Sequence, residues 1–289
     1  MYGKRKRVLR RKKPASKRGV IRRAVSKAKR GMFRKAVKGV ISSVAETKVC
    51  NYYYNNFGVV NTTSTAFQGT IKSLSPSGSS GAMITISQGT AAGQRVGNKL
   101  SVKKAILAGT VHINTVYDAV TNYNPCPLKV CLWIFQLKGG VTDDATSVND
   151  VVQNYFFEFG NTSIGMSGAV VDLTRAVNTS YVTLLKKRVF SVGTQQTVSG
   201  FGVNAPNNTN QQFSSNEQIM RMFKIDVTKI LRKTYTFNDT SNTTSNRQVW
   251  CMWVPYRVDG RIPDTSTGLN TGPVPAYISW SYDFYYKDL

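Results

Sequence analysis

The stretch LKVCLWIFQL, residues 128–137, is apolar on both faces of an extended chain. Side chains of a strand point alternately to its two faces, so a strand without a polar face must be covered on both sides. QVWCMWV, residues 248–254, has the same character, whereas YISWSYDFYY, residues 277–286, alternates. The apolar face of that last segment comprises Ile278, Trp280, Tyr282, Phe284 and Tyr286. These patterns predict two central strands of a sandwich and one half-buried strand.

Runs of β-branched and aromatic residues alternate with clusters of Gly, Pro, Asn, Ser and Thr after residue 49. The candidate strands are 67–74, 82–87, 99–116, 128–137, 181–192, 219–227, 247–254 and 276–286. Eight strands with long connections, over about 240 residues, predict an all-β fold, an eight-stranded jelly roll of two packed sheets. We therefore expect residues 49–289 to form one jelly-roll domain.

Residues 138–180 are too long for a hairpin turn, and they contain a helical pattern. The residues that recur at helical spacing are Val148, Val151, Val152, Tyr155 and Phe156. Ser147 is expected to cap this short helix. Long ordered loops often carry recognition or subunit contacts; alternatively, the helix closes one end of the barrel. The sequence favours neither role over the other.

The charge of the chain is large and unevenly placed. Lys and Arg number 39 against 14 Asp and Glu, for a net charge of +25. Residues 1–48 hold 19 of these cations and one acid, Glu46, so they carry +18, while the rest of the chain carries +7. A polyanion is therefore the expected partner of residues 1–48, with nucleic acid ahead of an anionic membrane surface.

Residues 1–48 form a basic arm with two parts. KRKRVLRRKK, residues 4–13, places eight cations in ten positions, and self-repulsion predicts disorder there. In residues 20–44, apolar side chains recur every three or four residues between Lys and Arg, which predicts a basic amphipathic helix once an anion screens the charge. The run KRKR at 4–7 is also typical of a nuclear localisation signal.

Active-site and metal-site patterns are not evident. His112 is the single histidine, and it lies beside no G-x-S-x-G motif, so a Ser-His-Asp triad is not supported. The cysteines, none of which forms a C-x-x-C pair, are Cys50, Cys126, Cys131 and Cys251. We expect Cys131 and Cys251 to be buried thiols, and we expect no enzymatic activity, metal or cofactor. The absence of an apolar signal core or an 18-residue apolar run predicts synthesis in a reducing compartment.

GQRVGNKLSVKKA, residues 93–105, places four cations in a segment typical of a strand. Strand alternation would put Arg95, Lys99 and Lys103 on one face and Lys104 on the other. We expect the basic face to extend the electrostatics of the arm onto the folded domain. A merely solvated outer face is the alternative.

The same region resembles a known family. QGTAAGQRVGNKLSVKKAIL, residues 88–107, is similar to a segment near the first strands of capsid proteins from circular, Rep-encoding single-stranded DNA viruses, the circovirus-like group. Later segments resemble later parts of those proteins, in order: LKVCLWIFQLKGG (128–140), DATSVNDVV (144–152), VTLLKKRVF (182–190), residues 233–260 and SYDFYYKDL (281–289). The resemblance spans roughly residues 85–289, and the arm matches only in composition.

The resemblance implies a structural protein. Copies would form a homo-oligomeric, T=1 icosahedral shell of 60 subunits around a single-stranded DNA genome, in the virion and, during assembly, in the host nucleus. Nuclear import receptors and an unidentified host cell receptor are the other implied partners. The expected nucleic-acid contacts are Lys4, Arg5, Lys6, Arg7, Arg10, Arg11, Lys12, Lys13, Lys17, Arg18, Arg22, Arg23, Lys27, Lys29, Arg30, Arg34, Lys35, Lys38, Arg95, Lys99 and Lys103. The expected localisation signal comprises Lys4, Arg5, Lys6, Arg7, Arg10, Arg11, Lys12 and Lys13.

Three other interpretations stay open. A capsid protein of a small, satellite-type single-stranded RNA virus would have the same arm and fold, and only residues 88–107 favour DNA. A cellular nucleic-acid-binding structural protein usually spreads its charge over its globular face, whereas residues 49–289 carry only +7. A membrane-active protein would use residues 20–44 as an interfacial helix, and the β domain would then have no role.

Overall fold

The chain divides into two compact units, Met1–Glu46 and Thr47–Leu289. The computed structural model describes residues 28–33, 36–37, 46–59, 71–79, 81–91, 93–113, 127–139, 143–193, 220–238, 242–258 and 276–288. In the first unit, residues 28–33 and 36–37 are helical and exposed, within the segment expected to form the basic helix. The rest of that helix and the run 4–13 lie outside the described residues.

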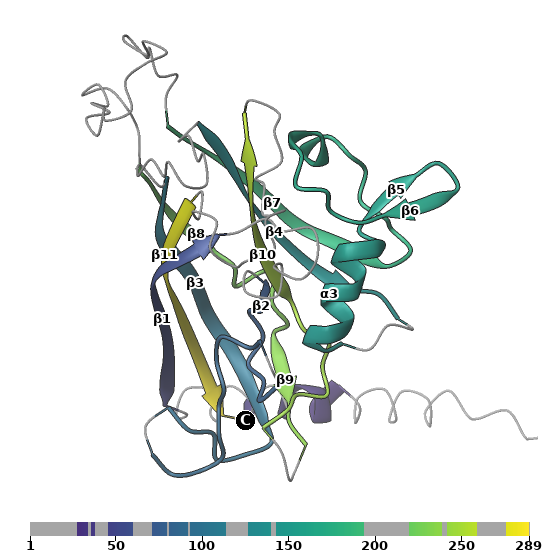
Figure 1. The fold of residues 1–289 in the computed structure, drawn as a ribbon. Helices are drawn as coiled ribbons and strands as arrows, with labels where there is room; N and C mark the ends of the chain where they lie inside the picture. The colour runs from purple at the N-terminus through teal and green to yellow at the C-terminus, as the bar shows by residue number, and fades with distance from the viewer. Residues whose placement is uncertain are drawn as a thin grey trace, which may run out of the picture. The chain divides into compact units, whose positions relative to one another are not determined.

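The second unit is a sandwich of two antiparallel sheets (Figure 1). The first sheet has the order β1 (Thr47–Val59), β11 (Ala276–Asp288), β3 (Lys99–Ile113) and β8 (Met220–Asp226), with β9 (Thr234–Thr236) beside the start of β3. The second has the order β2 (Ile71–Ser73), β10 (Trp250–Arg257), β4 (Leu128–Leu137) and β7 (Val182–Val192). With β9 left aside, the chain passes from one sheet to the other at each successive strand of the sandwich. The one exception is the step from β4 to β7, which both belong to the second sheet. This winding is the predicted eight-stranded jelly roll.

Two strand predictions were wrong. The strand β1 was not predicted, because Asn and Lys, which are poor strand formers, interrupt its aromatic residues. The segment 82–87 was predicted as a strand, but it makes only an isolated bridge between Ser73 and Ala82. Its Met83, Ile84 and Ile86 are buried in the core. The apolar composition of this segment therefore reflects core packing and not strand pairing. The other seven predicted strands overlap observed ones.

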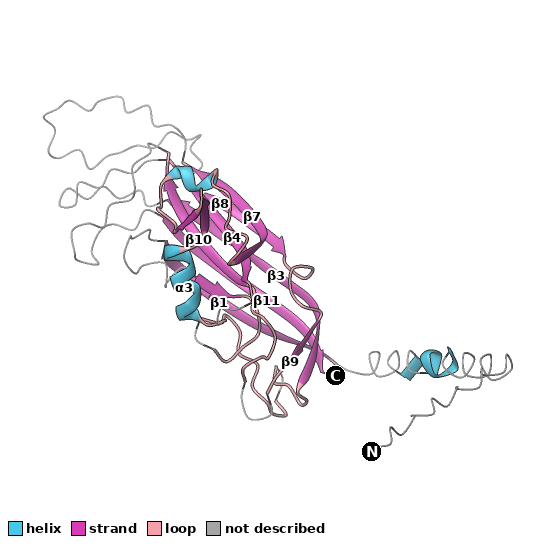
Figure 2. Cartoon of the chain, turned by 90° about the vertical axis from the view of Figure 1, so that its right-hand side faces the viewer, coloured by secondary structure: helices cyan, strands magenta, loops and turns pink. Residues whose placement is uncertain are grey.

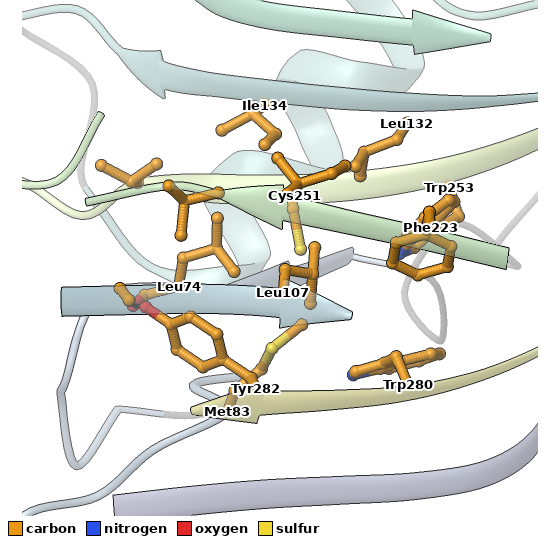
Figure 3. Close-up of a cluster of buried hydrophobic side chains, with 14 of the residues drawn as sticks. Leu74, Met83, Leu107, Leu132, Ile134, Phe223, Cys251, Trp253, Trp280 and Tyr282 are labelled. Atoms are coloured by element: carbon orange, nitrogen blue, oxygen red, sulfur yellow. Dashed lines mark hydrogen bonds between the residues drawn. The ribbon is translucent and has the colours of Figure 1, made fainter. Parts of the chain in front are cut away.

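The main core lies between the two sheets (Figure 3). Trp253 of β10 is fully buried, with its ring 5.1 Å from the Phe223 ring and 5.8 Å from the Phe190 ring. At the other end of the cluster, the Tyr282 hydroxyl donates to the Leu74 carbonyl oxygen at 2.7 Å. The apolar face of β11 lies in this core, as the alternation in 277–286 predicts.

A second core covers the other face of the second sheet. The helix α3 (Ala145–Asn154), the hairpin β5–β6 (Phe157–Phe159 and Thr162–Ile164) and the short helix η1 (Val170–Leu173) form this outer layer (Figures 1 and 2). The Trp133 ring of β4 meets the Phe156 ring edge-on at 5.6 Å. Both faces of β4 and β10 are therefore buried, as predicted. The helix covers a sheet face, so the alternative in which it closes a barrel end is wrong.

The predicted cap of α3 was also wrong. The N-cap is Asp144, whose side chain accepts a hydrogen bond from the Ser147 backbone N–H at 2.7 Å. Its neighbour Asp143 attaches the outer layer to β10, because its carboxylate accepts from the Trp250 indole N–H at 2.8 Å and from the Gln248 backbone N–H. One acidic pair thus starts the helix and fixes it to the sheet.

Replacing Asp143 with Ala should destabilise the fold by about 2–4 kcal/mol, because two inward-facing N–H groups lose their acceptor. Urea denaturation followed by far-UV circular dichroism measures this change. Asp150→Ala is the matched control, since Asp150 is exposed and its side chain accepts only from Asn154 within the helix. The control should change the unfolding free energy by less than about 0.5 kcal/mol. Equal effects of the two substitutions would contradict the anchoring role of Asp143.

The thiols of Cys131 and Cys251 are free and buried, as predicted. Burial raises the pKa of each thiol to about 12. Both groups are therefore neutral at physiological pH, and their place in the two cores makes them packing residues.

Candidate nucleic-acid interface

The basic segment 93–105 departs from simple strand alternation. The strand β3 begins only at Lys99, and the register shifts where Val102 pairs with Tyr286 and Lys104 with Tyr285. Lys103 is the extra residue of this β-bulge. Because a bulge resets the alternation, Lys103 and Lys104 are both exposed, whereas regular alternation would have put Lys104 on the opposite face.

The prediction that Arg95 shares this exposed face is wrong. Arg95 precedes the strand and is only 1% exposed. Its guanidinium donates to the Gly97 carbonyl oxygen and the Asn98 side-chain oxygen, both at 3.0 Å, and lies 4.4 Å from the Phe237 ring centroid. Arg95 therefore fixes the loop that leads into β3, and its charge is not presented to solvent.

A second segment adds cations beside the bulge. The Val102 backbone N–H donates to the Lys233 carbonyl oxygen at 3.0 Å, and the Ala105 N–H donates to the Thr228 hydroxyl at 2.9 Å. These bonds hold the turn 227–233 against β3. Six exposed cations gather there, and we call them the basic cluster: Lys99, Lys103, Lys104, Lys229, Arg232 and Lys233.

Asp226 borders the basic cluster. The hydrogen bonds from the hydroxyl and backbone of Thr228 hold the pKa of Asp226 below its ordinary value, and the nearby charges of Lys104 and Lys229 add to this effect. Asp226 is thus ionised under ordinary conditions and offsets one of the six positive charges. The cluster keeps a clear positive excess.

The basic cluster lies at the end of the first sheet where β1 begins. Thr47 pairs with Lys287, Lys287 with Ser101, and Ser101 with Thr234. Three strand spacings of roughly 4.8 Å place the start of β1 about 14 Å from β9. Lys48, the next residue of β1, forms an ion pair with Asp288 at 2.9 Å and so belongs to the sheet and not to the free arm.

The outer layer on the second sheet has the opposite charge. Residues 143–181 contain five acids and a single cation, Arg175. That cation pairs with the buried Asp172 at 2.7 Å. This layer is therefore acidic by sequence, which favours the first sheet over it as the candidate nucleic-acid side.

The expected contact residues fall into four groups. Lys99 and Lys103 lie in the basic cluster, Lys29 and Arg30 are exposed on a helical segment, and Arg95 is buried. The remaining expected arm residues, including the whole expected localisation signal, lie outside the described part of the chain. Lys104, Lys229, Arg232 and Lys233 were missed. The three cations within residues 229–233 could have indicated a basic patch. Nothing in the sequence, however, placed that segment beside β3.

The described residues show neither a metal site nor a membrane span. Among them, no three His, Cys, Asp or Glu side chains gather as metal ligands would. None of the described helices is both long and apolar enough to cross a bilayer.

Comparison with known proteins adds no family. Neither a protein-family model nor a curated protein matches this chain. The topology and the charge distribution are therefore the basis for function.

Reversing Lys103, Lys104 and Lys229 to Glu should lower the affinity of the full-length protein for a single-stranded oligonucleotide at least tenfold at 0.15 M salt, because three phosphate contacts are lost and replaced by repulsion. Fluorescence anisotropy across a salt series measures the effect. The control reverses Lys186, Arg188 and Arg221, an equal charge change at the β7–β8 edges. If both variants weaken binding equally, net charge matters and the position of the cluster does not.

Proposed function

We propose that this chain is a viral capsid protein that self-assembles into a small icosahedral shell and packages a circular single-stranded DNA genome. The observation that carries the proposal is the basic cluster at the end of the jelly-roll sheet where β1, the strand that follows the basic arm in the sequence, begins. The arm and the basic cluster would both attract a polyanion. A jelly roll is an architecture of capsid and lectin domains, and the arm favours the capsid role.

The charge of the arm suits a genome of modest size. Sixty copies would bring roughly 1,080 net positive arm charges, enough to neutralise on the order of a thousand phosphates. Contacts of this kind position nucleic acid without reading its sequence. The single-stranded DNA assignment, the T=1 shell of 60 subunits and the preference over a satellite-type RNA capsid come from the resemblance of residues 88–107.

The remaining partners belong to the same proposal. The cations at 4–13 would bind nuclear import receptors, so the protein would enter the host nucleus for assembly and leave in the virion. A host cell receptor would bind the outer surface of the particle.

Electron microscopy of the purified full-length protein tests the proposal. We expect closed shells of uniform diameter whose contents resist nuclease until the shells are opened. After opening, DNase should degrade the contents and RNase should not. Monomers that bind oligonucleotides without closing into shells would overturn the capsid role, and RNase-sensitive contents would indicate an RNA capsid.

A further inference from the structure

The outward face of the first sheet extends from the basic cluster across β1, β11, β3 and β8. Residues of β11 that alternate with its core residues point away from the core. Cross-strand pairing aligns Tyr285 with Lys104, Ser281 with Ala108 and Tyr277 with His112 along this face. The outer layer of α3 and β5–β6 packs on the other sheet, so it does not cover this face (Figure 1).

Aromatic side chains recur along this face. Tyr53 of β1 is 68% exposed and pairs with Ser281. Tyr285 lies between Lys104 of β3 and Val49 of β1. At the far end the rings of Tyr277 and His112 are stacked, with centroids 5.5 Å apart.

Cations flank these aromatic rings. Lys104 pairs directly with Tyr285, and Lys224 of β8 pairs with Ala108, next to the Ser281–Tyr53 row. Two carboxylates, Asp226 and Asp283, share the face on either side of Ile106. A carboxylate repels phosphate but accepts hydrogen bonds from the amino groups of bases. This arrangement of rings, carboxylates and lysines would allow bases to lie over the sheet while the phosphates contact the flanking lysines.

We propose that the outward face of the first sheet binds single-stranded nucleic acid by stacking unpaired bases on Tyr53 and Tyr285, with further stacking on the Tyr277–His112 pair. Every base has a π-face, so such stacking is tolerant of sequence, and it requires bases that are free of a duplex. The inference rests on the proposed function. It adds to that function a second nucleic-acid-binding element, the folded domain, which would prefer single strands.

The test separates stacking from charge with two oligonucleotides of equal length. Full-length protein stripped of nucleic acid is titrated with a fluorescent 20-nucleotide thymidine strand and with an abasic strand of the same phosphate number. The salt concentration is raised in steps, because the phosphate contribution falls steeply with salt. We expect the thymidine strand to bind more tightly than the abasic strand, most clearly at high salt.

The variants then assign the difference to this face. The double substitution Tyr53→Ala and Tyr285→Ala should lower thymidine-strand affinity about tenfold or more and leave abasic binding unchanged. Tyr53→Phe with Tyr285→Phe should retain the affinity, since the rings remain. The control Phe159→Ala removes an exposed ring, 62% exposed, from the outer layer and should change neither. A circular dichroism spectrum and melting curve check that each variant is folded.

Different results would overturn different claims. If the wild-type protein binds both strands equally and the alanine variant matches it, stacking is wrong and the packaging proposal stands. If the protein binds neither strand at 0.15 M salt, the packaging proposal itself fails. If the Phe159 variant weakens thymidine binding as much as the Tyr double variant, stacking on this face is wrong.

Discussion

Particles assembled from a chain that begins at Glu46 should lose most of their packaged nucleic acid. The deletion removes 18 cations per subunit and no acid. For a single strand, log affinity falls with log salt at about 0.7 per neutralised phosphate, so the affinity depends on the number of phosphate contacts. The six cations of the basic cluster are too few to replace the 18 that the deletion removes. The ratio of absorbance at 260 and 280 nm, and the mass of extracted nucleic acid, measure the loss.

The starting residue of that deletion matters. Lys48 forms an ion pair with Asp288 and donates to the Gln94 carbonyl oxygen at 2.6 Å, so a cut after Lys48 would also weaken the sheet. The matched control is an arm with the same residues in shuffled order, which should package normally because phosphate contacts are not sequence-specific. An arm of equal length with its Lys and Arg replaced by Gln should behave like the deletion. Normal packaging by the deleted chain would show that the arm is not the packaging element.

Replacing Trp253 with Ala should destabilise the jelly roll by about 3–5 kcal/mol. The ring is fully buried between the sheets against Phe190 and Phe223, which lie on the edge strands β7 and β8. Its loss leaves a cavity at the position where those edges of the two sheets meet. Denaturation by guanidinium chloride, followed by far-UV circular dichroism, gives the change in the unfolding free energy.

Two further substitutions calibrate that result. Trp253→Phe keeps an aromatic ring in place and should recover a large part of the loss. Phe159→Ala removes a ring that is mostly exposed in the outer layer and should change the free energy by less than about 0.5 kcal/mol. A cost below about 1 kcal/mol for Trp253→Ala would mean that the two sheets do not depend on this contact.

Local patterns predicted the central strands well. The segment 128–137 is observed with the predicted bounds, and both faces of β4 are buried because the outer layer covers one and the other sheet covers the second. The alternation in 277–286 likewise matches its burial in β11. Such patterns are reliable because side-chain alternation is fixed by the geometry of the strand itself.

Other features depended on contacts that no local pattern contains. The strand β1 has a weak composition and is stabilised by its full-length pairing with β11. The segment 82–87 has a strand-like composition, yet it fills the core without a ladder. In both cases tertiary pairing overrides local propensity.

The sequence by itself determined the all-β sandwich, the strong charge of the arm and the burial of β4, β10 and β11. Each follows from composition or from side-chain period, which the chain carries locally. The tertiary structure alone decided that Arg95 is buried, that a bulge exposes both Lys103 and Lys104, and that the turn 227–233 completes the basic cluster. Pairing between segments more than a hundred residues apart decides which strands are neighbours. It also decides where an extra residue forms a bulge and so changes which side chains face the solvent.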